Sequence, residues 1–123
     1  MVEIGSGLGG FSAYAAQYGA KQVIGLEISH AVDAAVSLLH EHPNLTFIQA
    51  DLLRPPLRHN PFDLVYTLGV LHHLVNPQEG FNTVVPLAKH ETGQMFIWVY
   101  GYENNALVRG IVEPLRAICN KLP

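Results

Sequence analysis

The sequence predicts an α/β domain in which a parallel sheet is covered by helices on both faces. Short apolar runs of strand length alternate with stretches that have helical periodicity. The expected strands are nearly continuous in apolar residues, which is typical of buried parallel strands. Apolar residues make up 49% of the 123-residue chain, enough for the core of one domain.

The first expected unit is a strand, a glycine-rich turn and a helix. Residues 1–4 predict the strand, and residues 10–19 predict the helix, which Gly19 should end in a left-handed conformation. Residues 22–27 then predict a second strand.

A second helix should follow, with Ser29 as its N-cap and Pro43 as its stop signal. Its apolar positions recur at helical spacing, namely Ala31, Ala34, Ala35, Leu38 and Leu39. Residues 45–50 predict the third strand, and the prolines of residues 51–61 predict a loop.

Residues 62–68 predict the fourth strand. A helix should start at Asn76, because a capping residue is followed there by Pro77 and the acid Glu79. Pro86 should break this helix.

The last expected elements are a strand and a helix. Residues 94–100 predict the fifth strand. A final helix should begin at about Asn105 and be kinked or divided by Pro114.

Composition excludes several classes of function. The formal net charge is −3 and no run of basic residues occurs, so we expect no nucleic-acid surface. The single Cys119 has no partner for a disulfide, so we expect a reducing, cytoplasmic setting. The five histidines other than His72 and His73 show no ligand spacing, so we expect no metal site. We expect neither a signal peptide nor a membrane span.

The turn "GSGLGG" should approach a ligand with its backbone. It fits the dinucleotide pattern through Gly5, Gly7 and Gly10, and a related pattern through Gly9. Glycine lets the chain turn sharply with no Cβ between backbone and ligand. A purely structural turn is the alternative.

Glu27 ends the second strand about twenty residues after Gly7. A carboxylate in that position can accept hydrogen bonds from both ribose hydroxyls and would repel a 2′-phosphate, which argues against NADP. NAD and an adenosyl ligand both remain open at this point. The alternative is an exposed acid at a strand end.

Three further features separate these two ligands. Glu3 lies inside the first strand, where an acid is costly without a polar partner. Asp51 ends the third strand in "FIQADL", where it could accept the exocyclic amine of adenine. The fourth strand continues as "FDLVYTLGVLHHL", with Gly69 and two histidines.

Together, "VEIGSGLGG", "VIGLEIS", "FIQADL" and "FDLVYTLGVLHHL" resemble the class I S-adenosylmethionine-dependent methyltransferases, especially the small-molecule type. The resemblance runs from Val2 to about Tyr100. It implies a Rossmann-like doubly wound sheet of five parallel strands in the order 3-2-1-4-5. It also implies one domain over residues 1–123, S-adenosyl-L-methionine as cofactor and a small-molecule methyl acceptor as partner.

The resemblance also implies roles for residues. Glu27 would hold the ribose hydroxyls, and Asp51 and Leu52 would face the adenine. Leu68 and Gly69 would offer backbone groups near the methionine ammonium. Glu3 would make that corner negative. The full set of cofactor-binding residues implied is Glu3, Gly5, Ser6, Gly7, Gly9, Glu27, Ile28, Asp51, Leu52, Leu68 and Gly69.

With this cofactor, methyl transfer needs little catalytic chemistry from the protein. Its methyl group is already activated on a positively charged sulfur, so the protein mainly aligns the acceptor and excludes water. If the acceptor must lose a proton, His72 and His73 are the nearest candidate bases. Alternatively, one of them packs or hydrogen-bonds to hold the loop.

The chain departs from the resembled family at both ends. It lacks a longer first strand with a preceding helix and the final antiparallel strand pair, and Gln94 stands where glycine is usual. We therefore expect an incomplete methyltransferase domain. A non-catalytic or partner-dependent remnant and an NAD-binding Rossmann domain are the alternatives, and the oligomeric state stays open.

Overall fold

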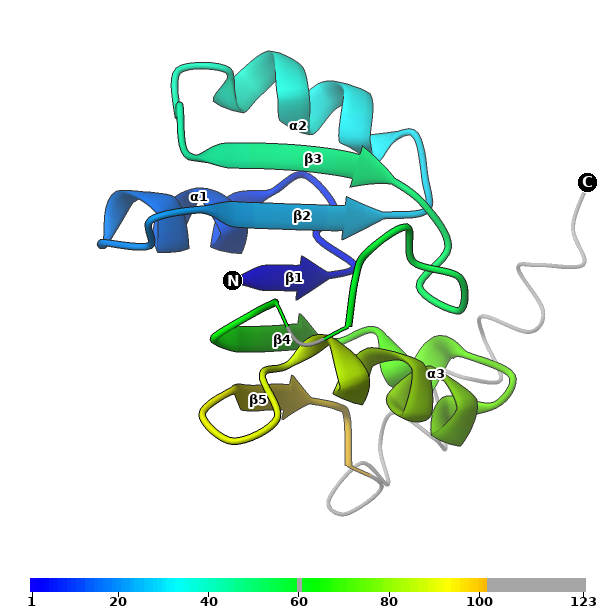
Figure 1. Cartoon of the computed structure of the whole chain (residues 1–123). Coiled ribbons are helices and arrows are strands. Elements are labelled where there is room, and N and C mark those ends of the chain that lie inside the picture. Colours follow the sequence, from blue (N-terminus) through cyan, green and yellow to red (C-terminus); the bar gives the residue numbers. More distant parts are fainter. Residues whose placement is uncertain (60, 102–123) are drawn as a thin grey trace, which may run out of the picture.

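The computed structural model describes residues 1–59 and 61–101, and its centre is one parallel sheet with the strand order β3-β2-β1-β4-β5 (Figure 1). The strands are β1 (Val2–Ile4), β2 (Val23–Glu27), β3 (Leu45–Gln49), β4 (Leu64–Leu68) and β5 (Gln94–Trp98). The predicted fold class and strand order are confirmed. All five strands point the same way, so their carboxyl ends meet at one edge of the sheet.

Helices lie on both faces of the sheet. They are α1 (Gly10–Gln17), α2 (Ala31–Leu39) and α3 (Pro77–Val84), with short 3₁₀ turns η1 (Leu71–His73) and η2 (Val85–Leu87). Right-handed crossovers run in opposite directions from β1, so α1 and α2 cover one face and α3 the other. Figure 1 shows α1 behind the sheet and α3 in front of it.

The core surrounds the short central strand β1. Val2 and Ile4 have no exposed surface, and neither has Val65 on β4. β1 pairs with β2 on one side and with β4 on the other. The apolar face of α3 and the turn η2 close the core in front through Val84 and Leu87.

Most local signals act as predicted. Gly19 has a φ of 105° after α1. The Asn76 side chain accepts the Glu79 N–H at the start of α3, and α3 passes into the 3₁₀ turn η2 that contains Pro86.

Some boundaries differ from the prediction. α2 starts at Ala31 after His30, although the Ser29 hydroxyl still accepts the Ala31 N–H. β4 starts at Leu64, because Phe62 makes only an isolated bridge to Ala88, and β5 ends at Trp98. The helix expected from Asn105 and the effect of Pro114 lie outside the described residues.

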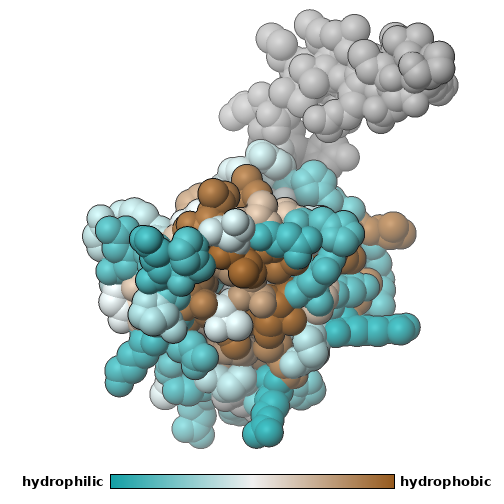
Figure 2. All heavy atoms as spheres, turned by 90° about the horizontal axis from the view of Figure 1, so that it is seen from above, coloured by the Kyte–Doolittle hydropathy of each residue, from teal (hydrophilic) through white to brown (hydrophobic). Residues whose placement is uncertain are grey.

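Exposed apolar surface remains on this domain. Behind β4 and β5, an open groove of about 450 Å³ is lined by Phe96, by Phe11 and Tyr14 of α1, and by Tyr18, which follows α1. Figure 2, which views the molecule from above, also shows apolar side chains in the middle of the face, bordered by hydrophilic ones. None of the helices within the described ranges is long and apolar enough to cross a membrane.

Candidate functional site

The glycine-rich turn joins β1 to α1 at the carboxyl edge of the sheet. The N–H groups of Gly5 and Ser6 both donate to the Leu26 carbonyl, at 2.7 and 3.0 Å, and the Gly9 N–H donates to the Ser6 carbonyl. Gly5, Gly7 and Gly9 all have positive φ values, between 54° and 80°. These bonds hold the turn tightly against the end of β2.

The three glycines have different surroundings. A Cβ on Gly5 would lie 2.3 Å from a methyl group of Val70, and one on Gly9 would lie 2.3 Å from the Phe47 ring. A Cβ on Gly7 would meet nothing within 4 Å. At Gly5 and Gly9, the missing side chain lets Val70 and Phe47 pack against the backbone. Gly7 faces open space where a ligand can approach the backbone.

Glu27 connects this turn to the end of β2. Its Oε2 atom accepts the Gly7 N–H and its Oε1 atom accepts the Ser29 N–H, both at 2.9 Å. Partial burial raises the carboxyl pKa, but the bonds from Ser29 and Gly7 outweigh burial, so the pKa lies below its usual value. The ionised carboxylate keeps a free lone pair on each oxygen for further donors.

Asp51 lies beside Glu27 at the same edge. The Ala50 N–H donates to the Glu27 carbonyl at 2.9 Å, which brings the end of β3 against the end of β2. The exposed Asp51 side chain accepts the Leu53 N–H through one oxygen. The structure therefore places the two predicted acidic residues at adjacent strand ends, with Glu27 bonded to the glycine-rich turn.

Two apolar residues were expected near these acids. The Ile28 side chain is 65% exposed, so it can contact a ligand. The Leu52 side chain is 8% exposed and belongs to the hydrophobic core. The Leu52 side chain is therefore part of the core, and the Leu52 N–H donates to no acceptor among the described residues.

Glu3 is buried away from this open surface. Its carboxylate accepts the Ser12 hydroxyl at 2.5 Å and the Tyr66 hydroxyl at 3.3 Å. Burial raises the Glu3 pKa, and the two hydrogen bonds only partly oppose the rise. Burial and the nearby Glu3 charge raise the Tyr66 pKa as well. Glu3 ties β1 to α1 and β4, a role that the sequence did not indicate because nothing marked Ser12 as its partner.

The remaining predicted cofactor residues have mixed environments. Ser6 is buried, and its hydroxyl has no partner within the described residues. Leu68 is half-buried and lines the groove behind β4 and β5. The Gly69 N–H donates to the Trp98 carbonyl at 2.8 Å, while the Gly69 carbonyl accepts no bond in the described part of the chain. That free carbonyl is a suitable acceptor for an ammonium group.

His72 and His73 follow β4 in the turn η1. Their rings lie 4.1 Å apart, and the His72 ring also meets Tyr100 edge-on at 4.7 Å. Burial, with a smaller contribution from His73, lowers the His72 pKa, so this imidazole is neutral near pH 7. Neither ring nitrogen of His72 has a hydrogen-bond partner among residues 1–59 and 61–101.

The segments at the carboxyl edge of the sheet carry a net negative charge. Residues 5–9, 27–30, 50–53 and 68–73 contain Glu27 and Asp51 but no Lys or Arg. Such an edge favours a positively charged ligand over a pyrophosphate. The described residues hold no group of three side chains suited to a metal ion.

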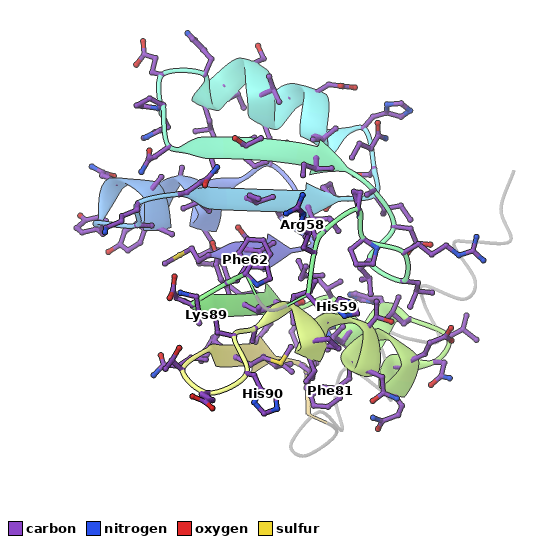
Figure 3. The ribbon with its side chains drawn as sticks, in the orientation of Figure 1. Arg58, His59, Phe62, Phe81, Lys89 and His90 are labelled. Atoms are coloured by element: carbon purple, nitrogen blue, oxygen red, sulfur yellow. The ribbon has the colours of Figure 1, made fainter. Side chains whose placement is uncertain are left out.

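A separate hollow of about 600 Å³ lies at the amino ends of the strands, away from the two carboxylates. Arg58 and Phe62 line it from the segment that passes in front of β1 (Figure 3). The candidate site is thus an open edge of the sheet and is distinct from the larger hollow.

Comparison with known proteins agrees with this fold. Residues 2–92 match the methyltransferase domain family. No curated protein sequence gives a significant match.

Similar solved structures include the YcgJ protein from Bacillus subtilis, with 22% identity over 94% of this chain and 50% of that chain, and a TM-score of 0.77. An S-adenosylmethionine-dependent methyltransferase from Mesorhizobium loti has 31% identity over 72% of this chain and 41% of that chain, and a TM-score of 0.64. A SAM-dependent methyltransferase from Aquifex aeolicus has 20% identity over 72% of this chain and 50% of that chain, and a TM-score of 0.65. The chain spans half or less of the length of these proteins.

Proposed function

This chain belongs to the methyltransferase domain family, and from that membership we propose that it is an S-adenosylmethionine-dependent methyltransferase with a small-molecule acceptor. The observation that carries the proposal is the Glu27 carboxylate, hydrogen-bonded to the Gly7 N–H and adjacent to Asp51. As the single Cys119 suggests, we place the protein in the reducing cytoplasm.

The residues at the carboxyl edge fit this cofactor. Glu27 has free lone pairs for two ribose hydroxyls, and Asp51 with the Leu52 N–H offers an acceptor and a donor for the adenine edge. Ile28 supplies an exposed apolar surface for the adenine ring. The Gly69 carbonyl, which accepts no hydrogen bond from residues 1–59 and 61–101, suits the methionine ammonium.

When bound, S-adenosylmethionine supplies a methyl group on a positively charged sulfur. The chain then has to bind and orient the two reactants and exclude water. Glu27 holds one end of the site rigidly, because the backbone of the glycine-rich turn and of Ser29 fixes its carboxylate. Neutral His72 can take a proton from the acceptor.

Calorimetric titration with S-adenosylhomocysteine tests the proposal. We expect saturable binding that Glu27→Gln weakens by about tenfold or more, since charge-assisted hydrogen bonds to the ligand are lost. Asp33→Asn is the matched control, because Asp33 is an exposed acid on α2 and should leave affinity unchanged.

Absence of heat and of thermal stabilisation with a folded chain would count against the proposal. Stabilisation by NADH instead of S-adenosylhomocysteine would favour the NAD-binding alternative. Binding of S-adenosylhomocysteine without methyl transfer to any acceptor in a broad screen would favour a non-catalytic remnant.

A further inference from the structure

Three aromatic side chains meet at the carboxyl ends of β4 and β5. The ring of Tyr100 lies edge-on to Trp98 at 4.8 Å and edge-on to His72 at 4.7 Å. Trp98 is 47% exposed and Tyr100 is 60% exposed. We call these three residues the aromatic cluster. It presents rigid ring surfaces that no other described residue covers fully.

The aromatic cluster is continuous with the candidate cofactor site. A Cβ on Gly69 would lie 3.6 Å from the Trp98 ring, and the Gly69 N–H bonds to the Trp98 carbonyl. Val70, the next residue, packs against Gly5 of the glycine-rich turn. The cluster therefore lies where an acceptor can meet a methyl group held at the carboxyl edge.

The aromatic cluster is mainly apolar and carries a few hydrogen-bonding groups. Residues 68–75 and 97–101 contain no Asp, Glu, Lys or Arg, so these segments offer no charge with which to bind a carboxylate, a phosphate or an amine. Its polar groups are the Tyr100 hydroxyl, the Trp98 indole N–H and the His72 ring nitrogens, and the last are buried and unpartnered within the described chain. An exposed surface of this kind favours a mainly apolar ligand that also carries a hydrogen-bonding group.

We propose, on the basis of the function proposed above, that the acceptor is a planar aromatic compound with a hydroxyl group, which packs against Trp98 and Tyr100 and hydrogen-bonds to His72. Aromatic rings favour edge-to-face or offset-stacked contacts with such a ligand. The depressed pKa of His72 supports this role, because a neutral imidazole nitrogen can accept the hydroxyl hydrogen.

The transfer balances in one step. The hydroxyl oxygen forms a bond to the methyl carbon while the bond from that carbon to sulfur breaks, and the sulfonium becomes a neutral thioether. The hydroxyl proton passes to His72 and then to solvent.

Trp98 is the single tryptophan of the chain, so its fluorescence reports binding without turnover. In the presence of saturating S-adenosylhomocysteine, we expect phenol to change this fluorescence saturably. Cyclohexanol, with similar size and one hydroxyl group but no aromatic ring, should bind at least about fivefold more weakly, since ring–ring contacts add to simple burial. Tetramethylammonium tests the alternative that the cluster binds a cation.

Single substitutions test the ring contact and the hydrogen bond separately. Tyr100→Leu should weaken phenol binding about fivefold, whereas Tyr18→Leu, just after the end of α1, should not. His72→Leu should weaken binding of phenol about fivefold but leave binding of anisole, which lacks the hydroxyl hydrogen, unchanged.

Three results would each overturn this inference. The first is equal affinity for phenol and cyclohexanol, and the second is tighter binding of tetramethylammonium than of phenol. The third is unchanged phenol binding in both Tyr100→Leu and His72→Leu. Because S-adenosylhomocysteine binding is measured separately, each of these results leaves the proposed cofactor site standing. Loss of S-adenosylhomocysteine binding itself would overturn the proposed function instead.

Discussion

Two glutamates near the glycine-rich turn show how local environment decides the role of a residue. Glu27 accepts two backbone N–H groups at the edge of the sheet, which stabilises its charged form. Glu3 accepts two hydroxyl groups in the interior, where burial disfavours its charge. Glu27 is therefore available to a ligand, and Glu3 is a structural link.

Because the two pKa values shift in opposite directions, the stabilising contributions of Glu27 and Glu3 should change in opposite directions as pH rises. The contribution of Glu27 is present above pH 4.5 and is lost as pH falls through its depressed folded pKa. The contribution of Glu3 is fully present below pH 4.5 and is lost as pH rises through its raised folded pKa.

We expect Glu3→Gln to gain stability relative to the parent chain as pH rises above about 4.5, because glutamine keeps an acceptor for Ser12 and Tyr66 but cannot ionise. Urea unfolding of both chains between pH 4 and pH 8 measures the difference. A difference that stays constant over this range would contradict the burial of an ionisable Glu3.

At the scale of elements, short helices depend on their termini and on one buried face. α3 has only 8 residues, too few to be stable alone, and it buries Gly80 and Val84 against the core. Its start is fixed by Asn76 and by Pro77, and Pro86 ends the regular helix. α3 in turn packs on η1, so the position of His72 depends on this helix.

We expect Asn76→Ala to lower the free energy of unfolding by about 1 kcal/mol, because the Glu79 N–H loses its side-chain acceptor. Asn82→Ala is the matched control within the same helix and should change stability by about 0.5 kcal/mol or less. Chemical denaturation measures both. Equal effects of the two substitutions would show that the cap does not stabilise α3.

At the scale of the whole molecule, the central strand connects two halves of the domain. β1 has 3 residues, yet it pairs with β2 and with β4 along its full length. One half carries the glycine-rich turn, Glu27 and Asp51, and the other carries the aromatic cluster. The two halves of the candidate site are therefore aligned by one short buried strand.

We expect Ile4→Ala to cost about 2–5 kcal/mol, because the Ile4 side chain is fully buried between the halves. Val36→Ala, at an exposed position of α2, should cost much less. Trp98 fluorescence reports the β5 half, and far-UV circular dichroism reports helices on both sides. The two probes should give the same unfolding midpoint in both variants, and separate midpoints would show that the halves unfold independently.

The parallel sheet and most element ends could be predicted because their causes are local or periodic. Alternation of strands and helices, the left-handed Gly19 and the cap at Asn76 all act over a few residues. The edge at which Glu27 and Asp51 meet was also predictable, since both lie at the carboxyl ends of parallel strands.

Other features depend on contacts between distant segments. Glu3 and Tyr66 are brought together by strand pairing, so the sequence could not show that Glu3 is used internally. Leu52 and Ile28 are both apolar residues beside a strand end, and only packing decides that one is buried and the other exposed.

The sequence by itself determined the fold class, the strand order through its family resemblance, and the set of residues gathered at the carboxyl edge. The tertiary structure alone decided which of them face open space: Gly7, Glu27, Ile28 and Asp51 do, whereas Glu3 and Leu52 do not. It also joined Trp98 and Tyr100 to His72. The physical reason is that side-chain type and spacing specify backbone elements, whereas exposure depends on how the core fills the space between them.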